Sequence, residues 1–163
     1  MNPKARKALG EGVVAGLILY AGVAAFFMAV NLLGGRPAFH TAGLLGEALF
    51  GGLRDPARAT LDPGWIVSYN GVHLVVSLVL GIAASFIVAL IDTHRLAWYG
   101  FFVLFRATFI MSLLLMGVVT VELAGVLRWH SVVTGHLAGG VVTWGYLAWA
   151  HAEDLPSLST EED

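Results

Sequence analysis

Three residues whose types bind metal ions or transfer protons stand inside long apolar stretches of this sequence: His73, Glu122 and His136. Two imidazoles and a carboxylate can bind zinc, iron, copper or manganese, and two histidines on separate helices can ligate a b-type haem. The same groups can relay protons or hydrogen-bond a quinone headgroup. No HExxH or ExxH motif is present, so a site requires assembly by the fold. A hydrogen-bonded His–Glu pair with a structural role is the open alternative.

The segments that must position these residues are four apolar stretches. A helix that spans a bilayer needs about 20 predominantly apolar residues. The stretches of sufficient length are 13–33, 65–91, 98–126 and 131–149. We expect an all-α integral membrane protein with a single transmembrane domain. Because the two later connections are short, the helices should form an up-and-down bundle.

The composition supports a membrane protein over a soluble domain. Of the 163 residues, 58% are hydrophobic and 12% are charged, whereas soluble domains carry about 25% charged residues. The chain has no cysteine, which excludes disulfides, thiolate metal sites and cysteine-ligated clusters. Its net charge is -2, so no basic field points to nucleic acid as a partner.

The first connection, residues 34–64, is much longer than the other two. Within it, 41–52 reads as a short interfacial helix, with Thr41 as the N-cap and two glycines, Gly51 and Gly52, at its end. A helix of this length cannot span a bilayer, so it should lie at the interface. The acidic tail, 153–163, is expected to be mobile.

The candidate site residues have similar expected depths. At 1.5 Å per residue, His73 lies about 12 Å, His136 about 7–8 Å and Glu122 about 6 Å from the same membrane face. Inverting the topology moves all three together, so this grouping does not depend on orientation. We therefore expect the three side chains to converge in the bundle interior, as a metal site or, through the two histidines, as a haem site.

Other residues are expected to contact lipid or a neighbouring subunit. Arg106 lies inside the third stretch, where it can extend toward headgroups or bind an anionic lipid. Trp98 and Trp149 stand at helix ends, the depth that amphipathic rings prefer. Stripes of small residues on the first, second and fourth stretches predict close helix packing, and the stripe on the first stretch is a candidate docking face for a partner.

Orientation is read from lysine and arginine. In the four-helix arrangement, the two sides of the membrane carry equal numbers of lysine and arginine residues. Lys4, Arg6 and Lys7 directly precede the first helix, however, and the charges beside the first helix usually decide the orientation. We therefore expect both termini on the inner side of a bacterial-type cytoplasmic membrane.

The function we expect is that of a small accessory subunit in a larger membrane assembly, with an electron-transfer complex as a plausible host. No nucleophile motif, P-loop or metalloprotease motif is present, so we do not expect an enzyme. A metal- or b-haem-binding protein that uses His73, His136 and Glu122 is the alternative, and an oligomeric transporter or channel is the second alternative. The expected partners are the lipid bilayer, with bound lipid, and other membrane subunits or further copies of the chain.

Overall fold

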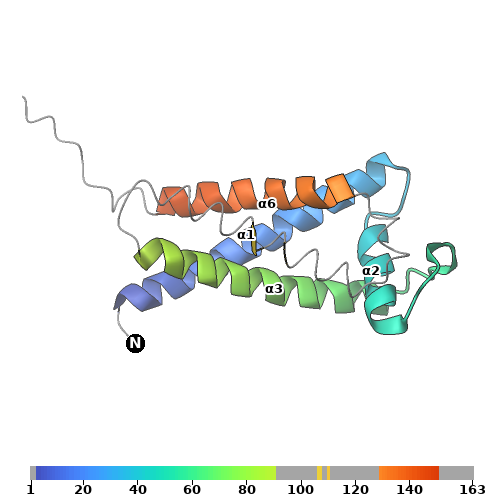
Figure 1. Ribbon diagram of the computed structural model, residues 1–163, viewed down its shortest axis with the longest axis horizontal. Helices are drawn as coiled ribbons and strands as arrows, with labels where there is room; N and C mark the ends of the chain where they lie inside the picture. The colour runs from blue at the N-terminus through green and yellow to red at the C-terminus, as the bar shows by residue number, and fades with distance from the viewer. Residues whose placement is uncertain (1–2, 91–105, 108–109, 111–128, 151–163) are drawn as a thin grey trace, which may run out of the picture.

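A computed structural model describes residues 3–90, 106–107, 110 and 129–150 (Figure 1). Within these residues the chain is helical and has no strand. The elements are α1 (Pro3–Leu33), α2 (His40–Gly51), the short 3-10 helix η1 (Pro56–Arg58), α3 (Pro63–Leu90) and α6 (Trp129–Ala150). The prediction of an all-α protein is confirmed for this part of the chain.

The helix positions agree closely with the apolar stretches. Helices α2, α3 and α6 match the predicted segments 41–52, 65–91 and 131–149 to within about two residues, the usual uncertainty of a helix end. Helix α1 begins at Pro3, well before the predicted start near residue 13. The predicted third crossing, 98–126, lies outside the described residues except for 106–107 and 110, and the tail, 153–163, lies outside them entirely.

The helix ends follow local sequence signals, with one correction. Helix α3 begins with Pro63, and the Asp62 carboxylate accepts a hydrogen bond from the Gly64 amide at 2.6 Å, which satisfies an amide that has no partner within the helix. Gly52 ends α2 in the left-handed conformation, with φ of +70°, as predicted. The expectation that Thr41 caps α2 is wrong: the cap position is Phe39, without a side-chain cap bond. The Thr41 hydroxyl instead binds Asn31 at the end of α1.

Helix α1 is the central helix of the described bundle and packs against both α3 and α6. Residue numbers run in opposite directions across each interface. Gly12 of α1 meets Ile82 of α3, while Gly16 meets Leu78. The same reversal relates α1 to α6, so both helices are antiparallel to α1 and run in the same direction as each other (Figure 1).

Small residues make the α1–α3 approach possible. A Cβ atom added at Gly81 would lie 2.5 Å from the Cα of Gly16 and 2.6 Å from the Gly12 carbonyl oxygen. These neighbours are backbone atoms, which cannot rotate away. The predicted glycine face of the first stretch is therefore used within the chain, against Gly81 and Ser77 of α3.

The buried core follows this arrangement. It draws on α1, α3 and α6 through Ala15, Leu19, Val23, Ala84 and Leu147. A smaller cluster lies at one end of the bundle, where Leu44 and Leu45 of α2 pack near Tyr69 of α3. Helix α2 thus covers the end of the bundle where α1 finishes and α3 begins (Figure 1).

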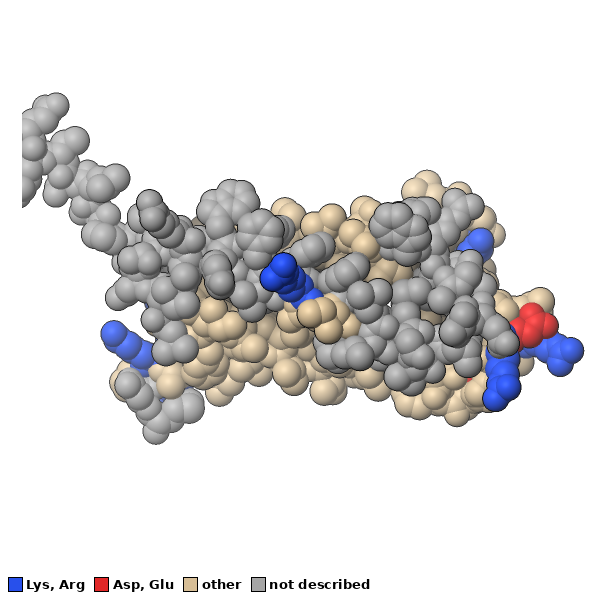
Figure 2. Space-filling model, viewed as in Figure 1, with Lys and Arg blue, Asp and Glu red and all other residues tan. Residues whose placement is uncertain are grey.

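Two of the described helices, α1 and α3, are long and apolar enough to cross a membrane. Their 31 and 28 residues correspond to about 46 and 42 Å, more than the roughly 30 Å of a bilayer's hydrocarbon core. In the view of Figure 2, basic side chains lie at the two ends of the molecule, with one partway along this face, and the remaining described surface is mostly uncharged.

Candidate functional site at the α1–α3 interface

The candidate histidine of α3, His73, lies against α1 and between two tyrosine rings. The ring centroid of Tyr20 on α1 is 5.2 Å from that of His73, and the ring of Tyr69, one turn earlier on α3, is 6.0 Å away. Aromatic rings at these separations make favourable contacts. His73 therefore occupies an aromatic environment inside the bundle and does not face the surrounding medium as an isolated polar group.

A hydrogen-bond chain fixes one of these tyrosines. The Tyr20 hydroxyl donates to Asn70 Oδ1 at 3.0 Å, and Asn70 Nδ2 donates to the Ile66 carbonyl at 2.8 Å. Each polar group thereby has a partner within the apolar interface, where an unpaired group is costly. This chain ties α1 to α3 beside the His73 ring.

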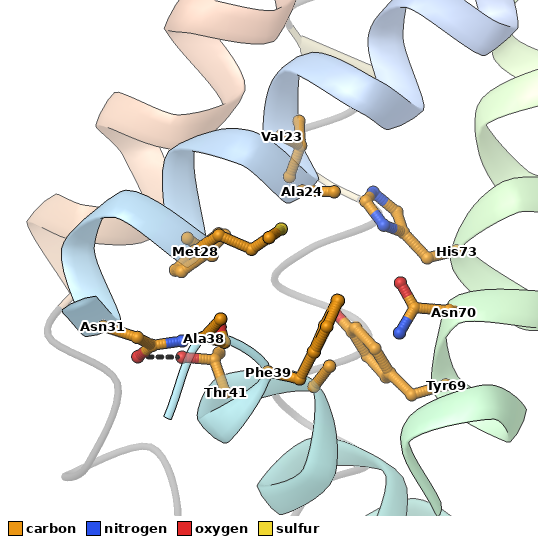
Figure 3. Close-up of a pocket in the computed structure, with 12 residues that line it drawn as sticks. Val23, Ala24, Met28, Asn31, Ala38, Phe39, Thr41, Tyr69, Asn70 and His73 are labelled. Atoms are coloured by element: carbon orange, nitrogen blue, oxygen red, sulfur yellow. Dashed lines mark hydrogen bonds between the residues drawn. The ribbon is translucent and has the colours of Figure 1, made fainter. Parts of the chain in front are cut away.

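A small cavity opens next to this cluster, with a volume of about 40 Å³. Figure 3 shows Tyr69, Asn70 and His73 extending from α3 toward it. The remaining lining comes from the second half of α1, from the turn that follows it and from the start of α2: Val23, Ala24, Phe27, Met28, Asn31, Ala38, Phe39, Thr41 and Ala42. Such a volume suits one or a few water molecules or a single ion. The b-haem alternative stays a prediction.

The far side of the cavity is held by Asn31, which is 3% exposed. Its amide Nδ2 donates to the Ala38 carbonyl, and its Oδ1 accepts from the Thr41 hydroxyl, both at 2.9 Å (Figure 3). The carbonyl of Asn31 also accepts from the Arg36 amide at 2.9 Å. One buried side chain therefore locks the turn between α1 and α2.

The second candidate histidine, His136 on α6, has a defined tautomer. Its Nδ1 lies 2.7 Å from the Val132 carbonyl oxygen. A carbonyl only accepts, so Nδ1 carries the hydrogen and Nε2 carries the lone pair of the neutral ring. The two imidazoles are near enough to interact electrostatically, although His136 is not part of the lining of the His73 cavity.

The other predicted site residues fall into two groups. Glu122 and Trp98 lie outside the described residues, so a three-ligand site with Glu122 stays a prediction. Arg106 and Trp149 are described and exposed, and Trp149 is 75% exposed. Their contact with lipid or a subunit stays a prediction. In the part of the chain that the structure describes, no three His, Asp or Glu side chains gather as a metal site.

The sequence analysis did not single out Tyr69 as a member of the site. Tyr69 shares a helix face with Asn70 and His73, and this spacing is visible in the sequence. Glu11, which does not line this cavity, was also missed as a largely buried acid of the first helix. It lies on α1, its side chain is only 13% exposed, and Lys7 Nζ is 3.9 Å from its Oε1. The signal was the i,i+4 spacing of Lys7 and Glu11, which implied a helix starting before residue 13.

Outside the apolar helices, His40 begins α2 beside Arg36. Burial and then the positive charge of Arg36 lower the pKa of His40 below its ordinary value. Its Nδ1 is buried and has no hydrogen-bond partner within the described residues. The neutral form is favoured because protonation would place a second cation next to Arg36.

Comparisons with protein-family models, with curated proteins and with solved structures find no match to this chain. Chemically, the described arrangement offers one imidazole between two phenol rings, a cavity of a few water volumes, and a second imidazole of fixed tautomer nearby.

Proposed function

We propose that this chain is a polytopic membrane protein with four crossing helices that acts as a non-catalytic subunit of a larger membrane assembly. The observation that carries the proposal is the apolar outer surface of all three long described helices. Exposed large side chains include Val13 and Leu17 on α1, Val75 and Val79 on α3, and Val142 on α6. Contiguous apolar surface on this scale calls for lipid or protein around it.

Chain connectivity supports a third crossing between α3 and α6. Both helices are antiparallel to α1, so α3 ends and α6 begins at opposite ends of the bundle (Figure 1). The chain between them therefore has to return over the bundle's length, and the apolar stretch 98–126 is the segment we propose for it. Four crossings leave both termini on one side, which we propose is the inner side of a cytoplasmic membrane.

The face we propose for a partner subunit is on α1. Ala21, Ala25 and Ala29 follow one another at four-residue spacing, and all three are exposed. Small residues allow the backbone of a second helix to approach closely, which is how helices associate in lipid. An electron-transfer assembly is the host we propose, because histidines such as His73 and His136 are ligands of redox metals.

A bulky residue on this face is expected to release the partner. Ala25→Phe should cost about 1–3 kcal/mol of association free energy through overpacking, which is roughly 5- to 150-fold in affinity. The measurement is the yield of co-purified subunits after mild detergent extraction of the tagged full chain from native membranes. Ala138→Phe on α6, also an exposed helical alanine, is the matched control and should retain the partner. Purification of the wild-type chain without any other subunit would contradict the proposal.

A transition-metal site that uses His73 and His136 is the second candidate function. The supporting observation is the Nδ1–H bond from His136 to the Val132 carbonyl. Metal-binding histidines usually donate their other ring N–H to such an acceptor, which orients the ring. The cavity of about 40 Å³ beside His73 has room for a single ion.

Metal content tests this candidate. The purified full chain is expected to carry a transition metal in stoichiometric amount, and His73→Ala and His136→Ala should each reduce it to background. His40→Ala is the control, since His40 is the first residue of α2 and does not line the cavity beside His73, so it should leave the metal in place. Elemental analysis gives the metal, and an absorption spectrum detects a haem. Wild-type protein with neither would overturn the candidate.

A further inference from the structure

The turn between α1 and α2 presents large apolar side chains outward. Leu33 is 89% exposed and Leu32 is 60% exposed, and Phe39 on the other side of the turn is also exposed. Arg36 lies between them and is exposed as well. We call these four residues, Leu32, Leu33, Arg36 and Phe39, the turn patch.

The turn patch is rigid. The Gly34 and Gly35 amides donate to the Val30 and Leu32 carbonyls at 3.1 and 3.0 Å, and Gly35 adopts a φ of +68°. Together with the buried Asn31 side chain, these bonds satisfy the end of α1 and fix the direction of the turn. Leu32 and Leu33 are therefore held outward by these bonds, and their exposure does not result from a frayed helix end.

Within the described residues, no ion pair neutralises the charge of the turn patch. Two acids of the same connecting segment have other partners: Glu47 accepts from the Thr60 amide at 2.9 Å, and Asp55 accepts from the Ala57 amide and pairs with Arg58 at 3.4 Å. Arg36 has no acidic partner within the described residues. Figure 2 shows basic and acidic side chains together at one end of the bundle, so the attraction to an anionic headgroup rests on Arg36 itself.

We propose that the turn patch lies at the lipid interface and binds an anionic phospholipid. Leu32 and Leu33 insert among the acyl chains, and the Arg36 guanidinium pairs with the headgroup phosphate. This division follows the chemistry of the interface, where apolar side chains are buried and arginine reaches the phosphates. The proposal rests on the proposed spanning arrangement, because α1 must bring its end to the membrane surface.

The absence of cysteine allows a direct test of depth. Leu33→Cys in the full chain is labelled with a nitroxide and reconstituted into vesicles of phosphatidylcholine and phosphatidylglycerol. We expect the label to be relaxed by oxygen, which concentrates in acyl chains, and not by a water-soluble nickel complex. Thr60→Cys, in the exposed loop before α3, should show the reverse.

A label at Val75→Cys on the outer face of α3 separates the two proposals. If Val75 reports lipid and Leu33 reports water, the turn patch is not a lipid site, while the spanning arrangement stands. If both report water, both proposals fail. A Leu33 label shielded from both relaxing agents would assign the turn patch to a protein partner and overturn the lipid assignment.

Lipid selectivity tests the role of Arg36. Native mass spectrometry counts phosphatidylglycerol and phosphatidylcholine adducts on the full chain. Arg36→Gln should lower the preference for phosphatidylglycerol about fivefold, the effect of one cation at an anionic surface. Arg58→Gln removes the same charge from the same connecting segment but from a residue already paired with Asp55, so its preference should stay near wild type. Unchanged selectivity in Arg36→Gln would overturn the headgroup contact.

Discussion

Gly81→Ala is expected to lower the free energy of unfolding by about 2–3 kcal/mol, because the added methyl overpacks the α1–α3 interface. The new Cβ would lie 2.5 Å from Gly16 Cα and 2.6 Å from the Gly12 carbonyl oxygen. Both are backbone atoms, so relief requires the two helices to move apart. Separation would also disturb the bond between Tyr20 and Asn70 beside His73.

Gly71 supplies a matched control on the same helix. A Cβ at Gly71 meets nothing within 4 Å, and the residue is exposed. Gly71→Ala should therefore stabilise the protein by about 0.5–1 kcal/mol, since glycine is unfavourable within a helix. Thermal unfolding in detergent, followed by circular dichroism, measures both variants. Equal changes of the unfolding midpoint temperature, with the same sign in both variants, would contradict the close approach of α1 and α3.

Asn31→Leu is expected to destabilise the α1–α2 turn by about 2–4 kcal/mol. The substitution removes two hydrogen bonds and leaves the Ala38 carbonyl and the Thr41 hydroxyl without their buried partner. Such orphaned groups cost about 1–3 kcal/mol each. Because α2 meets α1 mainly through this turn, we expect hydrogen exchange in α2 to accelerate more than exchange in α3.

The double variant Asn31→Leu with Thr41→Val is the control for this explanation. Replacing the hydroxyl by a methyl removes one of the two orphaned groups, so about 1 kcal/mol or more of the stability should return. A double variant that is less stable than Asn31→Leu alone would show that the loss comes from packing and not from hydrogen bonding. Comparison of the single and the double variant also tests whether the outward position of the turn patch depends on the hydrogen bonds of the turn.

Helix positions could be predicted from the sequence because membrane-length apolar stretches and their glycine and proline boundaries are local features. The starts and ends of α2, α3 and α6 follow from them closely. The start of α1 could not be read in this way. The prediction used apolarity to begin the first helix near residue 13, yet a helix continues through polar residues such as Lys7 and Glu11 when their spacing allows pairing.

The pairing of helices was not determined by the sequence. Small-residue stripes occur on α1, α3 and α6, and each stripe is compatible with several partners. The structure places α1 centrally and uses Gly12 and Gly16 against α3, while the stripe of Ala21, Ala25 and Ala29 faces outward. Such pairings are decided by how closely the backbones of two helices can approach each other. This distance depends on the surface shapes of both helices together.

The sequence by itself determined which residues have unusual chemistry for an apolar helix, and His73 and His136 stand on α3 and α6 as the apolar stretches predicted. Only the tertiary structure decided their surroundings. Tyr20 reaches Asn70 across 50 positions of sequence, and the cavity beside His73 draws its lining from α1, α3 and the start of α2. Composition and spacing describe residues within one segment of the chain. The volume and the hydrogen bonds of a site depend on the distance between segments, and only the packing of the helices fixes that distance.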